Sequence, residues 1–239
     1  MHFLALAADF DGTLSKASKV ASRTLNAIRQ LQGTGRKMIL VTGRSIDNLS
    51  QAVPQLEIFN RIVAENGAVL YRPVERKTVL LAPGLPRSLI PNLRQRKVEP
   101  LWLGEIFVAT RSENTQAVLD AIQELDVAAE IVTNNRTIMV LPAGINKATG
   151  LAVALDDLGI PPEAVVSVGD GENDTILFDF TGCGVAVANA GAAVKARADD
   201  VTDRPVGAGV SELIDRITAA EWVQVRRCQA QSAEALAQR

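Results

Sequence analysis

Two groups of acidic residues, far apart along the chain, have the residue types and the spacing of a metal-assisted active site. Asp9 and Asp11 flank a single phenylalanine and are followed by Gly-Thr, and Asp170 and Asp174 lie in the later run Gly-Asp-Gly-Glu-Asn-Asp. Carboxylates that converge raise one another's pKa unless a cation neutralises them, and hard oxygen ligands favour Mg²⁺. The two groups therefore predict a Mg²⁺ site if the fold brings them together.

The spacing of Asp9 and Asp11 also allows two carboxylates in one site to do different work. One can attack an electrophile while the other, kept protonated, delivers a proton to the leaving oxygen. Each group alone also fits a structural interpretation, in which Asp11 belongs to a turn, Asp170 to another turn, and Asp174 caps a helix. The presence of both groups after apolar strands favours the chemical interpretation.

Two further positions have side chains suited to an anionic substrate. Thr42 and Gly43 follow an apolar run, and a hydroxyl group with backbone amides at a helix start forms a phosphate cradle. Arg44, the next residue, fits a structural salt bridge as well as it fits a substrate contact. Lys147 begins a predicted helix, where the helix dipole disfavours a positive charge. Its position there argues mildly for a functional role, in which its charge offsets that of an anionic substrate, over a purely structural role.

The elements that must position these side chains follow a strand–helix–strand rhythm. Asp9 follows the apolar run 3–8, and Asp170 follows the apolar run 164–168, so both lie at the carboxyl ends of predicted strands. Open parallel α/β sheets bind their ligands at that edge. The remaining elements expected before residue 72 are a helix over 22–32 ending at Gly33, a strand over 38–41, a helix capped by Ser45 through 53, a strand over 61–64, a turn at 65–67 and a strand over 68–71.

A segment of different character interrupts this rhythm between about residues 81 and 141. It contains four prolines, and its pattern predicts a strand over 101–110, a helix over 115–125, and a hairpin over 130–141 that turns at Asn134-Asn135. We interpret it as a separate small α+β module inserted into a parallel sheet. After it we expect a helix over 147–158, a strand over 165–168, a helix after Asp174, a strand over 184–187, a helix over 192–198 and a polar helix over 221–239.

Composition limits the class of ligand. The chain has 239 residues, 47% of them hydrophobic, and 25 Lys and Arg against 27 Asp and Glu, a net charge of -2. The hydrophobic content predicts a packed core that needs no cross-links. The absence of a basic excess argues against a nucleic-acid or membrane partner, so we expect a small ligand. No leader peptide or apolar membrane span is evident, so we expect a cytoplasmic protein. We also expect a monomer or a weak homodimer.

The rare residue types narrow the chemistry further. Cys183 and Cys228 are too few for a disulfide framework and are spaced unlike zinc ligands, so we expect reduced thiols. His2 is the single histidine and lies near the terminus. A mechanism built on a histidine base or a Ser-His-Asp relay therefore lacks its central residue.

The order of these motifs resembles that of the haloacid dehalogenase (HAD) superfamily of phosphohydrolases. The motifs are Asp-Phe-Asp-Gly-Thr from Asp9, Thr-Gly-Arg from Thr42, the single Lys147, and Gly-Asp-Gly-Glu-Asn-Asp around Asp170. The Glu-Asn-Gly tripeptide at 65–67 and the position of the insertion are similar to the Cof-type branch, subclass IIB. The resemblance implies an α/β fold: a Rossmann-like parallel-sheet core made of 1–81 and 142–239, and a small inserted α+β cap of the C2 type, 82–141.

The resemblance also implies roles for individual residues. Asp9 would be the nucleophile that forms an aspartyl-phosphate, and Asp11 the general acid and then the base. The phosphate would be bound by Thr42, Gly43, Lys147 and Asn173, and Lys147 would also hold Asp9. Mg²⁺ would be bound by Asp9, Asp170, Asp174 and the backbone carbonyl of Asp11. The expected function is a Mg²⁺-dependent phosphatase for a small phosphorylated metabolite, such as a sugar phosphate or a phosphoglycolate-like acid.

Two other functions fit the same residues. A phosphomutase would use the same aspartyl-phosphate and return the group to a sugar. A receiver-like signalling module would store the phosphoryl group on an aspartate, but Asp11, as a general acid and base beside the nucleophile, argues for turnover. In the predicted cap, Arg87, Arg94, Arg111 and Arg136 are weighed as contacts for an anionic substrate and as solvated surface residues.

Overall fold

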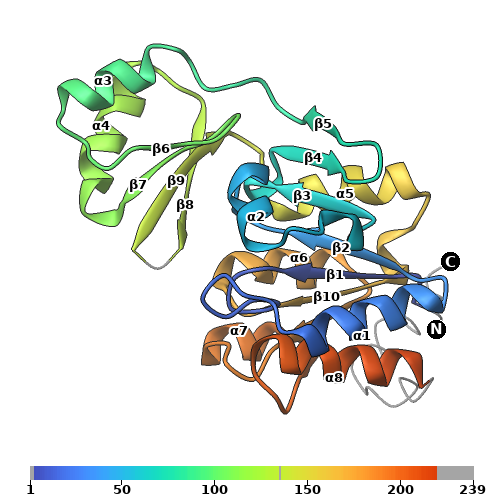
Figure 1. Cartoon of the computed structure of the whole chain (residues 1–239). Helices are drawn as coiled ribbons and strands as arrows, with labels where there is room; N and C mark the ends of the chain where they lie inside the picture. The colour runs from blue at the N-terminus through green and yellow to red at the C-terminus, as the bar shows by residue number, and fades with distance from the viewer. Residues whose placement is uncertain (1–2, 135, 220–239) are drawn as a thin grey trace, which may run out of the picture.

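The chain folds into two sheets that lie apart from each other. The computed structural model describes residues 3–134 and 136–219, so the turn residue Asn135, His2, Cys228 and the helix expected over 221–239 lie outside the described residues. One sheet has eight strands and the other has four. Figure 1 shows the smaller sheet and its helices beside one end of the larger sheet.

The larger sheet is parallel across its centre and antiparallel at one edge. Its strand order is β12-β11-β10-β1-β2-β3-β4-β5, and β4 and β5 are the antiparallel strands. Strands β1 and β10, which carry the two acidic groups, are direct neighbours, with Ala8 opposite Val168. The bounds are β1 (Ala5–Asp9), β2 (Lys37–Val41), β3 (Arg61–Ala64), β4 (Val69–Arg72), β5 (Lys77–Leu80), β10 (Val165–Gly169), β11 (Cys183–Ala186) and β12 (Asp200–Val201).

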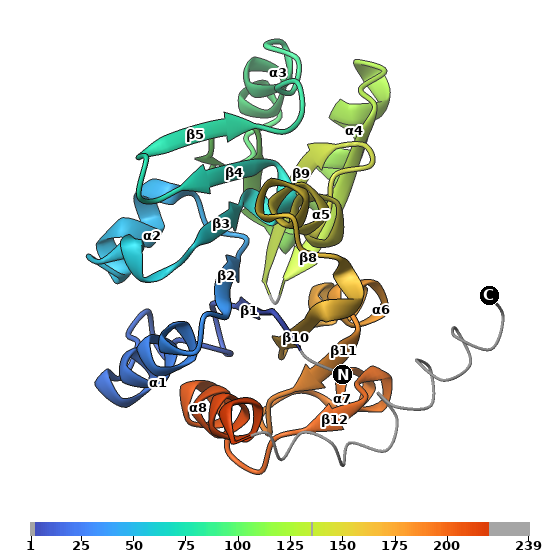
Figure 2. The ribbon, with the colours of Figure 1, turned by 90° about the vertical axis from the view of Figure 1, so that its right-hand side faces the viewer.

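Helices cover both faces of this sheet (Figure 2), as the continuous apolar strands predict. Along β1, Leu6 and Ala8 belong to one buried cluster with α1 and α8, while Ala5 and Ala7 belong to another with α5. This alternation is the two-residue period of a strand that is buried on both sides. The bounds are α1 (Ser22–Gly33), α2 (Ile46–Ala52), α5 (Lys147–Leu158), α6 (Thr175–Phe180), α7 (Ala192–Arg197) and α8 (Val206–Thr218), with short 3-10 turns at Leu56–Ile58, Glu65–Gly67, Ser112–Asn114, Pro162–Ala164 and Glu172–Asp174.

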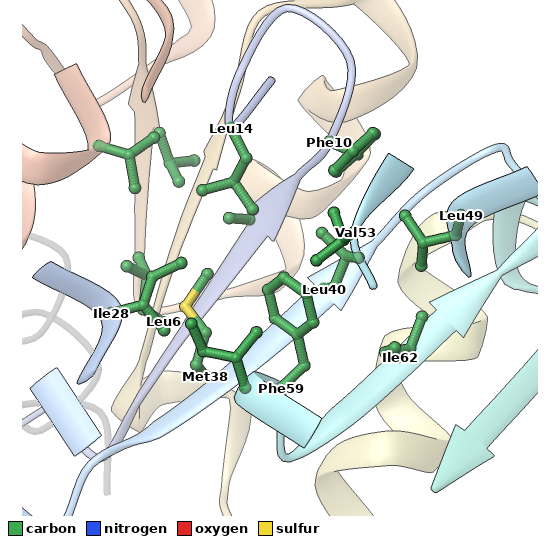
Figure 3. Close-up of a cluster of buried hydrophobic side chains, with 14 of the residues drawn as sticks. Leu6, Phe10, Leu14, Ile28, Met38, Leu40, Leu49, Val53, Phe59 and Ile62 are labelled. Carbon is green, nitrogen blue, oxygen red and sulfur yellow. The ribbon is translucent and has the colours of Figure 1, made fainter. Parts of the chain in front are cut away.

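The core beneath α1 is made of large side chains from neighbouring strands. Figure 3 shows Leu6 and Met38 packed with Ile28 of α1 and with Phe59, and all four are fully buried. Leu40 and Ile62 continue the same layer across β2 and β3. Burial of a side chain of this size stabilises a fold by about 1.5–3 kcal/mol, so this layer fixes the strand tips that carry the acidic residues.

The smaller sheet has its own hydrophobic core, and we call it, with its two helices, the cap. Its order is β6-β7-β9-β8, entirely antiparallel. Leu93 of α3 and Val118 of α4 pack against Val108 and Ile138 of the sheet. The bounds are β6 (Trp102–Leu103), β7 (Val108–Arg111), β8 (Ala129–Asn134), β9 (Thr137–Pro142), α3 (Leu89–Gln95) and α4 (Thr115–Glu124).

The structure differs from the sequence expectations in several places, among them β5, β12 and α8, which the sequence patterns did not identify. The single strand expected over 101–110 is wrong, because Gly104 N donates to Phe107 O (3.0 Å) and closes a turn between β6 and β7. The sequence patterns also do not identify α3, whose Pro91 lies in the first turn, where its missing N–H leaves no intrahelical bond unmade. Cys183 is disulfide-bonded, so the reduced thiol expected there is wrong; composition carries no information on which sulfur atoms the fold brings together.

Candidate active site

The carboxylates of the two acidic groups lie together at the carboxyl ends of β1 and β10. Asp9 is the last residue of β1, and Asp170 follows the last residue of β10. Asp9, Asp170 and Asp174 each offer a carboxylate oxygen, and these oxygens lie within 4.8 Å of one another. Because β1 and β10 are adjacent and parallel, their ends reach the same edge, which is the placement expected from the sequence.

Lys147 lies beneath this cluster and joins two of its members. Its Nζ donates to Asp9 Oδ1 and to Asp174 Oδ1, both at 2.6 Å, and all three side chains are buried. Lys147 is the first residue of α5, whose N-cap Asn146 accepts hydrogen bonds from Ala148 N and Thr149 N. The capping box therefore fixes the helix start that directs the ammonium group into the cluster.

The pKa values of Asp9 and Lys147 are both raised, which favours the neutral form of the carboxyl group and the charged form of the amine. Burial, followed by the negative charge of Asp174, raises the pKa of Asp9 to about 8, although Lys147 opposes the shift. Burial lowers the pKa of Lys147, but the charges of Asp174 and Asp9 outweigh it and leave the pKa above its usual value. Lys147 therefore keeps its proton, while the Asp9 carboxylate is short of positive charge.

Asp170 is held in place by Thr13, which follows β1, and by Asn189, which follows β11. Thr13 Oγ1 donates to Asp170 Oδ1 (2.7 Å), and Asn189 Nδ2 lies 3.5 Å from Asp170 Oδ2. Gly12 has a φ of 85°, and a Cβ there would lie 2.2 Å from Asp170 Oδ2. Only glycine fits between the two acidic groups at this point.

The other aspartate of the first group, Asp11, points elsewhere. Arg44 binds it through Nε to Oδ2 (2.7 Å) and Nη2 to Oδ1 (2.6 Å), and the Asp11 side chain is 45% exposed. The guanidinium also lies 4.9 Å from the centre of the Phe10 ring. Of the two interpretations weighed for Arg44, the structure therefore shows the salt bridge, and Asp9 and Asp11 occupy different environments although one residue separates them.

The predicted phosphate-binding residues surround the cluster at different depths. Thr42 is buried at the end of β2, where its Oγ1 accepts from Arg44 N (3.1 Å) and keeps its own hydrogen available to donate. Gly43 follows it, with the Asn66 side chain close by. Asn173 Nδ2 lies 3.5 Å from Asn66 Oδ1. Of the four predicted phosphate-binding residues, Asn173 lines the adjoining cavity, whereas Thr42, Gly43 and Lys147 do not.

A cavity of about 700 Å³ opens onto the carboxylates. Asp9, Asp11 and Asp174 line it from the larger sheet, and Thr133 lines it from β8 of the cap. Strand β8 also packs against the turn Glu172–Asp174. The cavity is therefore bounded by both sheets, with the acidic cluster at its base. The remaining lining residues are Gly12, Asp170, Gly171, Glu172, Asn173, Gly191, Ala192, Ala193 and Val194.

The sequence patterns missed two residues of this site. Asn189, which donates to Gly12 O (2.9 Å), follows β11, the neighbour of β10. The strand-end rule that identified Asp9 and Asp170 would have identified it too. Thr133 gives no such signal, because it lies in an edge strand of the cap and reaches the cavity only through the tertiary arrangement. The cap residues Arg87, Arg94, Arg111 and Arg136 do not line the cavity.

The donor set fits a hard divalent cation. Three carboxylates face one another, and within the described chain Lys147 is the cation bonded to them. Burial raises the pKa of Asp170 as well, and the charge of Asp174 adds to the shift. A group of oxygen ligands with excess negative charge is the environment that Mg²⁺ or a similar ion neutralises. Asp9, Asp170 and Asp174 are the residues that could hold it.

Comparison with known proteins identifies the family over most of the chain. The family model of the haloacid dehalogenase-like hydrolases matches residues 6–99 and 102–214. The phosphoglycolate phosphatase of Natronomonas pharaonis is 31% identical over 222 residues, which are 88% of this chain and 96% of that protein. The 5-amino-6-(5-phospho-D-ribitylamino)uracil phosphatase of Bacillus subtilis is 26% identical, with 87% and 95% covered.

Solved structures share the fold, including the cap. A haloacid dehalogenase-like hydrolase from Bacteroides thetaiotaomicron superposes with a TM-score of 0.73 at 22% identity, covering 90% of this chain and 99% of that one. A HAD subclass IIB sugar phosphatase gives 0.74 at 23% identity, with 90% and 98% covered. None of the helices in the described part of the chain has the length and hydropathy that a bilayer span requires. The chain belongs to the haloacid dehalogenase-like hydrolases, in their Cof-type branch, and is a phosphatase, that is, a phosphoric monoester hydrolase.

Proposed function

We propose that this phosphatase is Mg²⁺-dependent and hydrolyses a small phosphorylated metabolite through an aspartyl-phosphate on Asp9. The observation that supports this most directly is the buried Asp9 carboxylate at the base of the cavity, 2.6 Å from Lys147 Nζ and within reach of Asp170 and Asp174. Phosphoryl transfer needs positioning and neutralisation of charge more than elaborate acid–base chemistry. This cluster supplies both.

In the first step, a carboxylate oxygen of Asp9 attacks phosphorus and the bond from phosphorus to the leaving oxygen breaks. Asp11, which lines the same cavity, gives that oxygen its proton. In the second step, Asp11 takes a proton from water, the water oxygen attacks phosphorus, and inorganic phosphate leaves as Asp9 is regenerated. To deliver the proton, the Asp11 side chain must break its salt bridge with Arg44. Its exposed position at the cavity allows this movement.

Positive charge and hydrogen-bond donors stabilise the phosphoryl group in both steps. Lys147 holds Asp9 in place and supplies a point charge, while the Thr42 hydroxyl, the Gly43 backbone and the Asn173 amide are proposed donors to phosphoryl oxygens. Mg²⁺, held by Asp9, Asp170, Asp174 and the backbone carbonyl of Asp11, would add neutralising charge for the phosphoryl oxygens.

A phosphoglycolate-like acid or a sugar phosphate is the proposed substrate. Relatives named phosphoglycolate phosphatase support the first, and a structural neighbour named a sugar phosphatase supports the second. A cavity of about 700 Å³ accepts either. A phosphomutase would use the same residues, and identification of the product as free phosphate or as an isomeric sugar phosphate separates the two. Membership of a hydrolase family argues against the receiver-like alternative.

The division into a core of 1–81 and 142–239 and a cap of 82–141 is likewise a proposal. The separate hydrophobic core of the smaller sheet supports it, and β9 ends at Pro142, one residue beyond the proposed cap boundary. A monomer or weak homodimer and a cytoplasmic location stay predictions.

Replacement of the nucleophile tests the proposed mechanism. We expect Asp9→Asn to lower the rate with Mg²⁺ and p-nitrophenyl phosphate or 2-phosphoglycolate by about 10³-fold or more, because the amide keeps the shape but does not attack phosphorus. Asp47→Asn, the same change at an exposed position of α2, is the control and should keep the wild-type rate. Near-normal turnover by the Asp9→Asn variant, with an unchanged circular dichroism spectrum, would exclude Asp9 as nucleophile.

A further inference from the structure

The tripeptide Glu65–Gly67, between β3 and β4, has an unusual backbone. Its three residues have positive φ angles of 52°, 53° and 109°. The left-handed region disfavours residues with a Cβ, so Glu65 and Asn66 are strained. Strained backbone persists where the surrounding contacts over-determine it, and it occurs often at functional sites. The contacts of this tripeptide therefore indicate what it does.

The Glu65 side chain leaves the larger sheet and binds the cap. Its carboxylate accepts hydrogen bonds from Glu105 N (2.8 Å) and Ile106 N (2.9 Å), in the turn between β6 and β7. Glu65 is 1% exposed, so these bonds lie out of water. A buried carboxylate that binds backbone amides is a strong, directional contact. The turn it holds, 104–107, lies 40 residues away in sequence, as the Glu65–Glu105 separation shows.

The backbone of the same tripeptide binds the predicted catalytic segments. Asn66 N donates to Thr42 O (3.0 Å), and Glu65 N donates to Arg44 O (3.0 Å). A Cβ on Gly67 would lie 2.0 Å from the carbonyl oxygen of Asn146, the residue before Lys147. The tripeptide thus touches the ends of β2 and α5 on one side and the cap turn on the other.

We propose that Glu65 is a positioning residue that anchors the 104–107 turn on the larger sheet and thereby sets the position of the cap over the Asp9 cavity. Thr133 lines that cavity from the same four-stranded sheet, so a shift of the anchored turn moves the cavity wall. The hydrogen bonds from Glu105 N and Ile106 N to the Glu65 carboxylate, which exist only while the cap is in place, offset part of the strain at Glu65. This role depends on the proposed function only for its kinetic test.

Two variants break the anchor from opposite sides. Glu65→Gln keeps the backbone and the side-chain size but turns one acceptor oxygen into a donor that faces amide N–H groups. Gly104→Ala leaves Glu65 intact, but its Cβ would lie 2.5 Å from Glu65 Oε1 and 2.3 Å from the Phe107 ring. Glu105→Gln makes the same chemical change as Glu65→Gln on an exposed side chain of the same turn and serves as the matched control.

The first measurement is amide hydrogen exchange of the full chain. Glu65→Gln and Gly104→Ala should raise the exchange rate at Glu105 and Ile106 by about tenfold or more, since the bond to a charged group is lost, while amides of β1 and β10 keep their protection. Glu105→Gln should behave as wild type. Unchanged exchange at Glu105 and Ile106 in the Glu65→Gln variant would overturn the anchor.

The second measurement is the kinetics of p-nitrophenyl phosphate hydrolysis with Mg²⁺. A loosened cap lowers the fraction of molecules ready to bind, so KM should rise about tenfold while kcat stays within about twofold of wild type. Unchanged KM, or a fall in kcat with no change in KM, would overturn the link between anchor and cavity. If the wild-type protein hydrolysed no phosphate ester, the proposed function would fail, and the exchange measurement would still decide the anchor.

Discussion

At the residue scale, Lys147, Asp9 and Asp174 depend on one another because their charges are buried together. Asp9, Asp174 and Lys147 are each less than 10% exposed, and removal of one partner from such a group leaves an uncompensated buried charge. Lys147 supplies one positive charge for two carboxylates bonded to it. The protein alone therefore leaves the cluster short of positive charge, and proton or metal binding makes up the difference.

Competition between protons and metal at Asp9 gives a pH prediction. Because the pKa of Asp9 is raised to about 8, its carboxylate is largely protonated below that pH in the metal-free protein. Mg²⁺ requires the ionised form, so Mg²⁺ affinity should rise by up to about tenfold per pH unit as pH increases toward 8, and level off above it. Isothermal titration calorimetry between pH 6 and 9 measures this, and a flat profile would contradict it.

The same titration tests Asp170 as a ligand. Asp170→Ala should weaken Mg²⁺ binding and lower the activation of phosphatase activity by Mg²⁺, because one of the three proposed carboxylate ligands is removed. Asp179→Ala removes a carboxylate that pairs with Arg197 on the surface and is the control. An unchanged Mg²⁺ titration in the Asp170→Ala variant would exclude Asp170 as a ligand.

At the scale of elements, an ion-pair network joins α5 to the two strands that it covers. Asp157 of α5 accepts from Arg61 of β3 (Nε to Oδ2, 2.5 Å) and from Arg72 of β4. Burial raises the pKa of Asp157, but the hydrogen bonds and charges of Arg61 and Arg72 outweigh it and hold that pKa below its usual value. The network fixes the far end of the helix whose first residue is Lys147.

Asp157→Asn should therefore lower the free energy of unfolding by about 1–2 kcal/mol at pH 7. The folded-state pKa is depressed, so the stabilisation is present above the usual value of 3.8 and is lost as pH falls through the folded value. The difference between the variant and wild type should therefore shrink progressively as pH falls below 3.8. Urea unfolding at pH 7 and at a series of pH values below 3.8 measures this, and Asp156→Asn, at the exposed neighbouring residue, should have little effect throughout.

At the scale of the whole molecule, the cap supplies one wall of a cavity whose reactive groups come from the larger sheet. Thr133 lies on β8, an edge strand of the cap, and Asp9 and Asp170 lie at the carboxyl ends of β1 and β10. Figure 1 shows β8 in the smaller sheet and β1 and β10 in the larger one. The reactive groups and this part of the cavity wall thus come from different sheets. Substrate size should depend on the cap while the chemistry depends on the core.

Thr133→Phe tests this separation. A phenyl ring in the cavity wall should lower kcat/KM for fructose 6-phosphate about tenfold more than for the smaller 2-phosphoglycolate, if both are hydrolysed. Thr133→Ser keeps the hydroxyl and adds no bulk, so it should leave the ratio unchanged. An equal loss for both substrates in the phenylalanine variant would show that Thr133 does not select by size. The ratio of the two kcat/KM values is the measurement.

The sequence alone determined the features that depend on local pattern. Short apolar runs ending in aspartate located β1 and β10 and put Asp9 and Asp170 at their carboxyl ends, and helical spacing with caps located α1, α2 and α5 within a residue or two. These patterns are reliable because strand ends, turns and caps are set by neighbours along the chain. The parallel α/β sheet with an inserted module follows from the same rhythm.

Only the tertiary structure decided which distant groups meet. Three sets of contacts join segments that no local pattern connects. They are the salt bridge between Arg44 and Asp11, the hydrogen bonds from Lys147 to Asp9 and Asp174, and the hydrogen bonds from the 104–107 turn to the Glu65 carboxylate. The split of 101–110 into β6 and β7 likewise depends on a turn that Glu65 binds. These contacts are fixed by the way the two sheets pack, because the burial of apolar faces and the strand order determine which distant residues become neighbours.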